Sequence, residues 1–172
     1  MIRFQYKPTF ADYWLFNRWI FVRAFKKLLP FAALSLVAFL CAPFWFKWLQ
    51  FATTAEAYQQ TWFLLLLPIF VLVVYGLTYR AATKSWKTAG QLQEEREYTF
   101  DETGVQIQGG SYAGSSEWPN FTHAELCQGI VLIQNEQRQF HFFAVSCLPS
   151  PEAFFELVSR KIPKAKLGPK NK

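Results

Sequence analysis

Two histidine–cysteine pairs carry the side chains in this sequence that are best suited to metal binding or nucleophilic chemistry. His123 and Cys127 are four residues apart, and His141 and Cys147 are six residues apart. Zinc sites built from such ligands use short repeated spacings, and this chain contains no Cys-x-x-Cys pair. A Cys–His nucleophile also needs a third group that orients the base. The sequence therefore predicts no metal site, no cofactor and no catalytic residue.

A glycine- and serine-rich stretch at residues 109–116, GGSYAGSS, has the composition of a phosphate-binding loop without its pattern. Such a loop continues into Lys-Ser or Lys-Thr and opens a helix, and neither follows here. The stretch is therefore predicted to be a flexible connection. The aromatic candidates for contact with a partner or ligand are Tyr112, Trp118 and Phe121. For Trp118, packing in a core is the alternative interpretation.

Two long uncharged stretches occupy most of the first half of the chain. Residues 28–46 contain 19 residues without a charge, and residues 57–79 contain 23. At about 1.5 Å per residue, a 19-residue helix covers roughly 28 Å, close to the thickness of the hydrocarbon core of a bilayer. We therefore predict a hairpin of two transmembrane helices over residues 28–79. Two buried helices of a soluble protein are the alternative.

The composition is typical of a small membrane protein with a soluble part. Of the 172 residues, 52% are apolar and 19% aromatic, which excludes a disordered chain. The mean hydropathy is nevertheless only +0.06, so the apolar residues must be concentrated in part of the chain. Three cysteines argue against a disulfide framework.

The distribution of basic residues predicts the orientation in the membrane. Residues 1–27 carry six basic residues and one acidic residue, whereas residues 47–56 carry only Lys47 and Glu56. Basic flanks stay on the cytoplasmic side, so both termini are expected in the cytoplasm of a bacterium, with the spans in its inner membrane. The first apolar run is too long, and begins too late, for a cleavable signal peptide.

Aromatic and basic side chains at the ends of the spans are expected to anchor them at the membrane interface. These predicted anchors are Trp45, Trp48, Trp62, Arg80, Lys84 and Lys87. The three basic anchors follow one another at helical spacing, and each contributes about 1 kcal/mol near anionic headgroups. The predicted partner is therefore a lipid bilayer with anionic headgroups.

Small residues and one proline indicate how the two spans pack. The first span carries small residues at helical spacing: Ala32, Ser35, Ala38 and Ala42. Small residues let a neighbouring helix approach closely, so the second span is the expected partner and a homodimer the alternative. Pro68 frees the carbonyl of Leu64 and predicts a kink in the second span.

The segments that flank the spans have distinct compositions. Residues 1–27, rich in aromatic and basic residues, are predicted to form an interfacial segment; packing on the soluble domain is the alternative. Residues 80–96 have the composition of a juxtamembrane helix, and residues 164–172 that of a disordered basic tail.

Residues 97–163 have the pattern of a small α+β domain. Segments 97–100 and 105–108 surround a turn, as do segments 129–134 and 139–145, which predicts two hairpins. Ser150 and Pro151 begin an amphipathic helix that ends near Pro163. Residues 91–163 carry 10 acidic and four basic residues, a net charge of −6. This charge argues against a nucleic-acid surface.

The order of these parts resembles the YcxB-like family of bacterial membrane proteins. The similarity rests on the aromatic start FQYKPTFADYWLFN, the two spans, the segment TFDETGVQI, the tryptophan in SSEWPNF, a second hairpin and a final helix. The resemblance implies a β domain similar to a pleckstrin-homology-type barrel, with a helix as its cap. The basic residue expected after the second hairpin is missing from AVSCLPSPEAF.

We therefore predict a non-enzymatic inner-membrane protein whose cytoplasmic domain is a protein-interaction or regulatory module. Its partner would be an unidentified protein or a second copy of the chain. An immunity-type protein that neutralises a membrane-acting toxin is one alternative, and a toxin gene beside this one would favour it. A lipid-binding or small-ligand-binding domain at the membrane surface is another, and a pocket near Trp118 would favour it.

Overall fold

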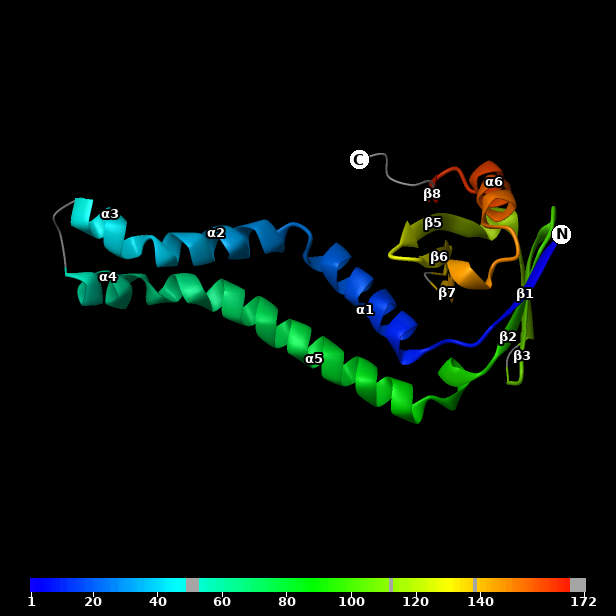
Figure 1. Ribbon diagram of the computed structural model, residues 1–172, viewed down its shortest axis with the longest axis horizontal. Coiled ribbons are helices and arrows are strands. Elements are labelled where there is room, and N and C mark those ends of the chain that lie inside the picture. The colour runs from blue at the N-terminus through cyan, green and yellow to red at the C-terminus, as the bar shows by residue number, and fades with distance from the viewer. Residues whose placement is uncertain (49–52, 112, 138, 168–172) are drawn as a thin grey trace. The chain divides into compact units, whose positions relative to one another are not determined.

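The computed structural model of the protein describes residues 1–48, 53–111, 113–137 and 139–167, with the side chains of residues 46–48 left out. It divides the chain into a β unit, Met1–Asn17 with Ala82–Lys172, and a helical unit, Arg18–Ala81. Figure 1 shows the elements, which in chain order are β1 (Ile2–Tyr6), α1 (Phe10–Phe25), α2 (Leu28–Leu40), α3 (Ala42–Trp48), α4 (Thr54–Thr61), η1 (Trp62–Leu65), α5 (Leu66–Thr88), η2 (Gly90–Gln93), β2 (Arg96–Phe100), β3 (Gly104–Gly109), β4 (Ala113–Glu117), η3 (Trp118–Asn120), β5 (Phe121–Cys127), β6 (Ile130–Asn135), β7 (Phe140–Ala144), η4 (Val145–Cys147), α6 (Pro151–Lys161) and β8 (Ala165–Lys166).

The β unit has an α+β fold built on two four-stranded sheets. Strands β1–β4 form an antiparallel sheet in chain order. The second sheet has the order β7-β6-β5-β8, in which β8 is parallel to β5 and the other pairs are antiparallel. The amphipathic helix α6 buries Phe154, Leu157 and Val158 in the core of this unit. These elements agree with the α+β class expected from the sequence.

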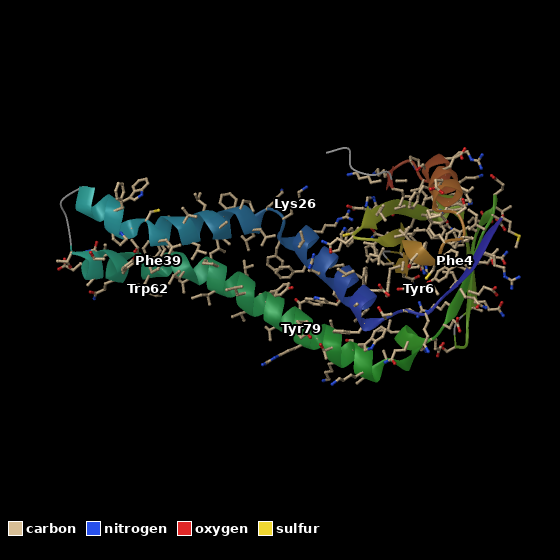
Figure 2. All side chains as sticks on the ribbon, in the orientation of Figure 1. Phe4, Tyr6, Lys26, Phe39, Trp62 and Tyr79 are labelled. Carbon is tan, nitrogen blue, oxygen red and sulfur yellow. The ribbon has the colours of Figure 1, made fainter. Side chains whose placement is uncertain are left out.

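The first strand, β1, was not predicted. It pairs with β2 from Ile2 opposite Phe100 to Tyr6 opposite Arg96. Its residues alternate: Phe4 and Tyr6 point into the β unit, as Figure 2 shows, whereas Arg3 and Gln5 are exposed. The predicted interfacial segment over residues 1–27 is therefore wrong for its first residues, which belong to a sheet.

Aromatic stacking holds β1 in the core. The ring centroid of Phe4 lies 5.4 Å from that of Tyr98 and 5.0 Å from that of Phe143. The Tyr6 hydroxyl donates to an Asp12 carboxylate oxygen at 3.0 Å. Burial, with the negative charge of Asp12 nearby, raises the pKa of Tyr6 above its usual range.

Helix α1 begins at a reciprocal cap. The Asp12 amide donates to Thr9 Oγ1, and the Thr9 amide donates to Asp12 Oδ2, each at 3.2 Å. The first half of α1 packs in the β unit. The ring centroid of Phe16 lies 5.2 Å from that of Phe142, and the ring centroid of Tyr13 lies 5.6 Å from that of Trp86. Packing on the folded domain, the alternative interpretation of this segment, therefore describes the first half of the helix.

Both predicted hairpins and the final helix are confirmed. They correspond to β2–β3, β6–β7 and α6, with Ser150 as the N-cap position and Pro151 as the first residue of the helix. A third hairpin, β5–β6, was missed. Its two-residue turn, Gln128-Gly129, has positive φ angles of 49° and 86°, which suit a tight hairpin turn.

Two segments predicted to lack structure contain strands. The expected flexible connection at residues 109–116 includes most of β4, which pairs with β3. The expected basic tail at residues 164–172 begins with β8, and Leu167 after it is buried. Both strands are short and have no apolar alternation of their own, so only their pairing partners reveal them.

The helical unit differs from the predicted hairpin of two transmembrane helices. The first apolar run, residues 28–46, is divided at Cys41 into α2, which has 13 residues, and the short α3. The second run lies within one continuous helical segment, Thr54–Thr88, which extends into the predicted juxtamembrane segment. Among the described residues, this segment alone is long and apolar enough to cross a membrane. The prediction of two spanning helices is therefore wrong for the first of them.

Replacing Phe4 tests whether β1 is an integral strand. Because Phe4 is stacked in a closed aromatic core, Phe4→Ala should lower the free energy of unfolding of the β unit by about 3–5 kcal/mol. Gln5→Ala, at an exposed position of the same strand, should change it by less than about 0.5 kcal/mol. Denaturant unfolding of the detergent-solubilised protein measures both. Equal stability of the two variants would contradict the assignment.

Candidate functional site

The helical unit has a first arm, α2–α3, and a second arm, formed by α4, η1 and α5. Both arms expose large apolar side chains, as Figure 2 shows. Within the most apolar window of the Thr54–Thr88 segment, only 11% of residues are buried inside the protein. Exposed apolar side chains include Phe31, Leu34 and Leu40 on α2 and Phe70, Leu72, Val73 and Leu77 on α5. A core helix of a water-soluble protein would bury such residues, so this surface is a candidate interaction surface.

The predicted anchors lie on the surface where the structure describes them. Trp45 and Trp62 are more than half exposed, at 65% and 59%. Arg80, Lys84 and Lys87 are exposed on α5. Trp48 ends α3, but its side chain lies outside the described residues.

The two arms of the helical unit pack through most of the predicted small residues. Ala32 is buried against Phe21 and Val71, and Leu67 packs on the same cluster. Ala42 is buried as well, whereas Ala38 is exposed. The small residues at 32, 35 and 42 therefore match the packing face, and the assignment of Ala38 to it is wrong. The next residue, Phe39, contacts the second arm instead, with its ring centroid 5.1 Å from that of Tyr58.

A hydrogen bond from Ser35 of the first arm compensates for the proline of the second arm. Pro68 has no N–H, so it leaves the carbonyl of Leu64, four residues earlier, without its helical donor. The Ser35 hydroxyl donates to this Leu64 carbonyl. The backbone tightens into the 3₁₀ turn η1 just before α5. The neighbouring arm thus satisfies the group that the proline frees, as helices in apolar surroundings require.

In the β unit, a pocket of about 320 Å³ opens between the two sheets. Its apolar floor is formed by Val105, Ile107 and Phe121. Its polar lining comes from β4, η3 and the β6–β7 turn: Ser115, Ser116, Asn120, Asn135, Glu136, Gln137, Gln139 and His141. Of the three aromatic contact candidates, Phe121 alone lines this pocket; Tyr112 lies outside the described residues.

Asn135 and Gln139, which line the pocket, are held in place by hydrogen bonds to each other. The Gln139 backbone amide donates to Asn135 Oδ1 at 2.8 Å, and Asn135 Nδ2 donates to Gln139 Oε1 at 3.1 Å. The Glu136 amide donates to the Asn120 carbonyl at 2.8 Å, which ties the turn to η3. These bonds keep the polar side of the pocket in place.

His141 lines the same pocket and is neutral over most of the acidic range. It is paired with Ile133 in the sheet, so its ring points inward, where it lies 6.4 Å from Phe121. Burial, together with the positive charge of Arg96, lowers its pKa to about 4. The imidazole is therefore a neutral hydrogen-bonding group near pH 7.

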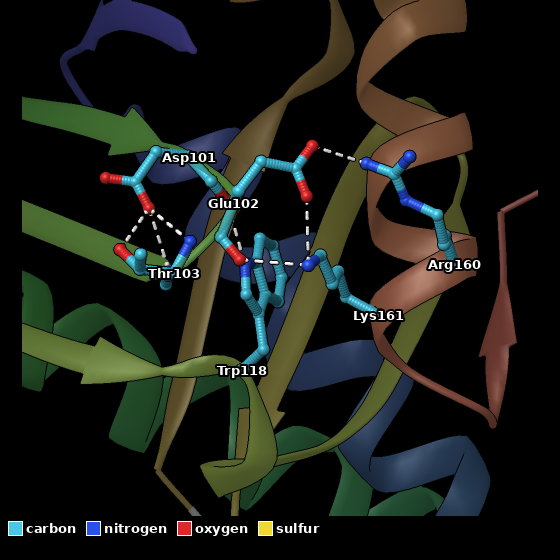
Figure 3. Close-up of polar contacts among 7 residues, drawn as sticks. Asp101, Glu102, Thr103, Trp118, Arg160 and Lys161 are labelled. Atoms are coloured by element: carbon cyan, nitrogen blue, oxygen red, sulfur yellow. Dashed lines mark hydrogen bonds and ion pairs between the residues drawn. The ribbon is translucent and has the colours of Figure 1, made fainter.

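Trp118 packs in the core and not in the pocket. Its side chain is only 4% exposed, and its Nε1 donates to the Asp101 carbonyl at 2.8 Å. Figure 3 shows the neighbouring turn, where the Asp101 carboxylate accepts hydrogen bonds from Thr103 and from the Gly104 amide. These bonds lower the pKa of Asp101. The core interpretation of Trp118 therefore describes its position.

An ion cluster joins this turn to the last helical turn of α6, as Figure 3 shows. The Glu102 carboxylate contacts Arg160 and lies 2.9 Å from Lys161 Nζ. Lys161 Nζ also donates to the Glu102 carbonyl at 2.9 Å. The hydrogen bond from Lys161 and the nearby positive charges lower the pKa of Glu102. The cluster positions α6 at the end of the β2–β3 hairpin.

The histidine and cysteine residues considered for metal chemistry are not gathered in one place. His123 Nε2 lies 3.2 Å from a carboxylate oxygen of Glu125. His141 faces the pocket, and Cys41, Cys127 and Cys147 form no disulfide bond with the described residues. Within the ranges that the structure describes, no three His, Cys, Asp or Glu residues form a group that could hold a metal ion.

Comparison with known proteins adds no assignment to this geometry. No protein-family model matches the chain, and no curated protein and no solved structure shows significant similarity to it. The candidate sites therefore rest on the residues themselves: an apolar helical surface and a polar pocket between two sheets.

A double-mutant cycle tests the Ser35–Leu64 hydrogen bond. Ser35→Ala removes the donor and should lower stability by about 0.5–1.5 kcal/mol, the range for such bonds in apolar surroundings. Pro68→Ala restores the N–H that the Leu64 carbonyl lacks, so Ser35→Ala should cost almost nothing in that background. Unfolding of the protein in mixed micelles gives the four free energies. Additive effects would contradict the pairing.

His141 predicts a pH dependence of stability. Because its folded pKa lies below its unfolded value of 6.5, the unfolded chain binds a proton that the folded protein rejects. Stability should therefore fall as the pH drops from about 6.5 to about 4, by up to about 3 kcal/mol. His141→Gln should remove this component. Thermal unfolding of both proteins across this range compares the slopes, and identical slopes would contradict the burial of His141.

Proposed function

We propose that the protein is embedded in a lipid bilayer through its helical unit and that its β unit serves as a non-enzymatic interaction or regulatory module. The observation that carries this proposal is the apolar surface of the helical unit, whose longest helix leaves most of its apolar window unburied. At about 25 cal/mol per Å², water contact over such a surface costs far more than contact with lipid. The Ser35–Leu64 hydrogen bond supports the same environment.

The pairing of β1 with β2 constrains how the chain meets the membrane. The long helix of 35 residues reaches roughly 52 Å, more than the hydrocarbon thickness of about 30 Å. The strands before and after the helices lie in one sheet, so both ends of the helical insertion lie on the same side of the bilayer. The basic flanks support a cytoplasmic position for both termini in a bacterial inner membrane.

Two further features of the prediction enter this proposal. The exposed Arg80, Lys84 and Lys87 are suited to anionic headgroups. The two sheets with α6 beside them support a pleckstrin-homology-type barrel and, with it, the resemblance to the YcxB-like family. The pocket favours binding over catalysis, because neutral amides and hydroxyls make up most of its polar lining.

Membrane extraction and cysteine labelling test the proposal. In washed bacterial membranes, the wild-type protein should resist alkaline carbonate. Leu72→Glu, in the exposed apolar face, should release most of it, because an acidic side chain in the bilayer is costly. Gln106→Glu, at an exposed position of β3, is the matched control and should stay in the membrane.

Single cysteines define the sidedness in a background without native cysteines. With a membrane-impermeant maleimide, Thr54→Cys at the start of α4 should react in intact spheroplasts. Ser111→Cys in the β unit should react only after lysis. Carbonate release of the wild-type protein, or labelling of both cysteines from the same side, would overturn the proposal.

A further inference from the structure

Strand β4 lies at an edge of its sheet. It pairs with β3 on one side, and none of the other described strands pairs with its second side. An edge strand presents backbone N–H and C=O groups to its surroundings, and proteins usually protect such an edge with charges, proline or a bulge. The five residues of β4, Ala-Gly-Ser-Ser-Glu, include one charge, Glu117 at the end, and no proline. The edge is therefore open to another strand.

The pocket lies beside this edge because β4 places its smallest residues inward. Gly114 is opposite Ile107 and Ser116 is opposite Val105, so both face the apolar floor of the pocket. A large side chain at either position would fill the space between the sheets. Ser115 lies between these two residues, is exposed and also contributes to the lining of the pocket. The cavity is thus the gap left by missing core side chains at the open edge.

The lining defines what would fill this gap. Asn135 and Gln139 fix each other, whereas the ring nitrogens of His141 have no hydrogen-bond partner among the described residues. Neutral amide, hydroxyl and imidazole groups above an apolar floor suit a side chain that is polar but uncharged. The pocket volume of about 320 Å³ is at the lower end of the range for small-molecule binding sites.

The acidic residues beside the pocket favour a ligand with basic residues on either side of its buried side chain. Glu136 at the β6–β7 turn and Glu117 at the end of β4 are both exposed beside the pocket. Residues 91–163, which hold the pocket, carry a net charge of −6. A segment with basic residues on either side of its buried side chain matches this field.

We propose that β4 and this pocket bind an extended peptide segment that adds a strand to the sheet and inserts an uncharged polar side chain between basic flanks. Backbone hydrogen bonds to an edge strand provide affinity in this mode, and the pocket for alternate side chains provides specificity. The inference deepens the proposed interaction function and rests on it, since it names the surface and the chemistry of the partner.

Capped pentapeptides test the proposal with the full chain in neutral detergent micelles. The probes are Lys-Thr-Gln-Thr-Lys, the acidic Glu-Thr-Gln-Thr-Glu, the apolar Lys-Thr-Leu-Thr-Lys, and N-acetylglutamine amide as a ligand without an extended backbone. The basic glutamine peptide should bind at least about tenfold more tightly than the other three. Hydrogen–deuterium exchange should show that it protects the amides of residues 113–117.

Neighbouring variants locate the site. Ser116→Leu fills the pocket and should weaken binding about tenfold or more, whereas Gln106→Leu, at an exposed position of β3 that does not line the pocket, should keep it within about twofold. Glu136→Lys, at an exposed position, should weaken binding of the basic peptide several-fold and does not depend on the fit of the core. Unchanged exchange in β6 verifies that each variant is folded.

Three results would overturn the proposal. They are absence of protection at β4 with every peptide, equal binding of N-acetylglutamine amide and the basic peptide, and equal losses for Gln106→Leu and Ser116→Leu. The assay in micelles does not depend on membrane insertion. Its failure alongside normal carbonate resistance would reject the peptide site alone, whereas carbonate release would reject the membrane proposal alone.

Discussion

The pairing of β1 with β2 is the constraint on which the rest of the structure depends. It joins a strand that precedes the helices to one that follows them, from Ile2 opposite Phe100 to Tyr6 opposite Arg96. Closing so long a connection costs chain entropy, although this cost rises only slowly with length. The aromatic contacts of Phe4 with Tyr98 and Phe143 offset it. The β unit is therefore complete only when the helical unit brings β1 back to its sheet.

The parts of the fold that sequence patterns predicted are those with local physical causes. The β2–β3 and β6–β7 hairpins, and α6 with its 3–4 period, are defined by neighbouring residues. β4 and β8 could not be predicted in this way, because each is short, lacks apolar alternation and takes its conformation from a partner strand. β1 does carry a local signal, the alternation of Ile2, Phe4 and Tyr6 with polar residues, and this signal was missed. The break at Cys41 lies two residues before Pro43, a signal that was present in the sequence and was not used. Pro68 and Ser35 were recognised separately, but only the structure shows that Ser35 donates to the Leu64 carbonyl that Pro68 leaves free.

The candidate pocket was largely hidden from the sequence for a different reason. Trp118 stood out as a large aromatic residue, yet burial and its hydrogen bond to the Asp101 carbonyl place it in the core. Asn135, Gln139 and Ser116 carry no pattern that marks a site, and they meet only where two sheets converge. The signal that was present was the run of small residues in GGSYAGSS, which leaves space at the edge and not only freedom in a loop.

The Ser35–Leu64 hydrogen bond also fixes the axial register of the two arms of the helical unit. Apolar helices can slide past each other with little change in contact energy, but a slip by one turn, about 5.4 Å, would leave the Leu64 carbonyl without a donor. The sheet fixes one end of the insertion, and this bond fixes the sliding position further along. Matched additions of residues beyond this bond, at the tip of the arms, would preserve both fixed points. Descendants of this chain could therefore change the length of the helical unit without altering the β unit.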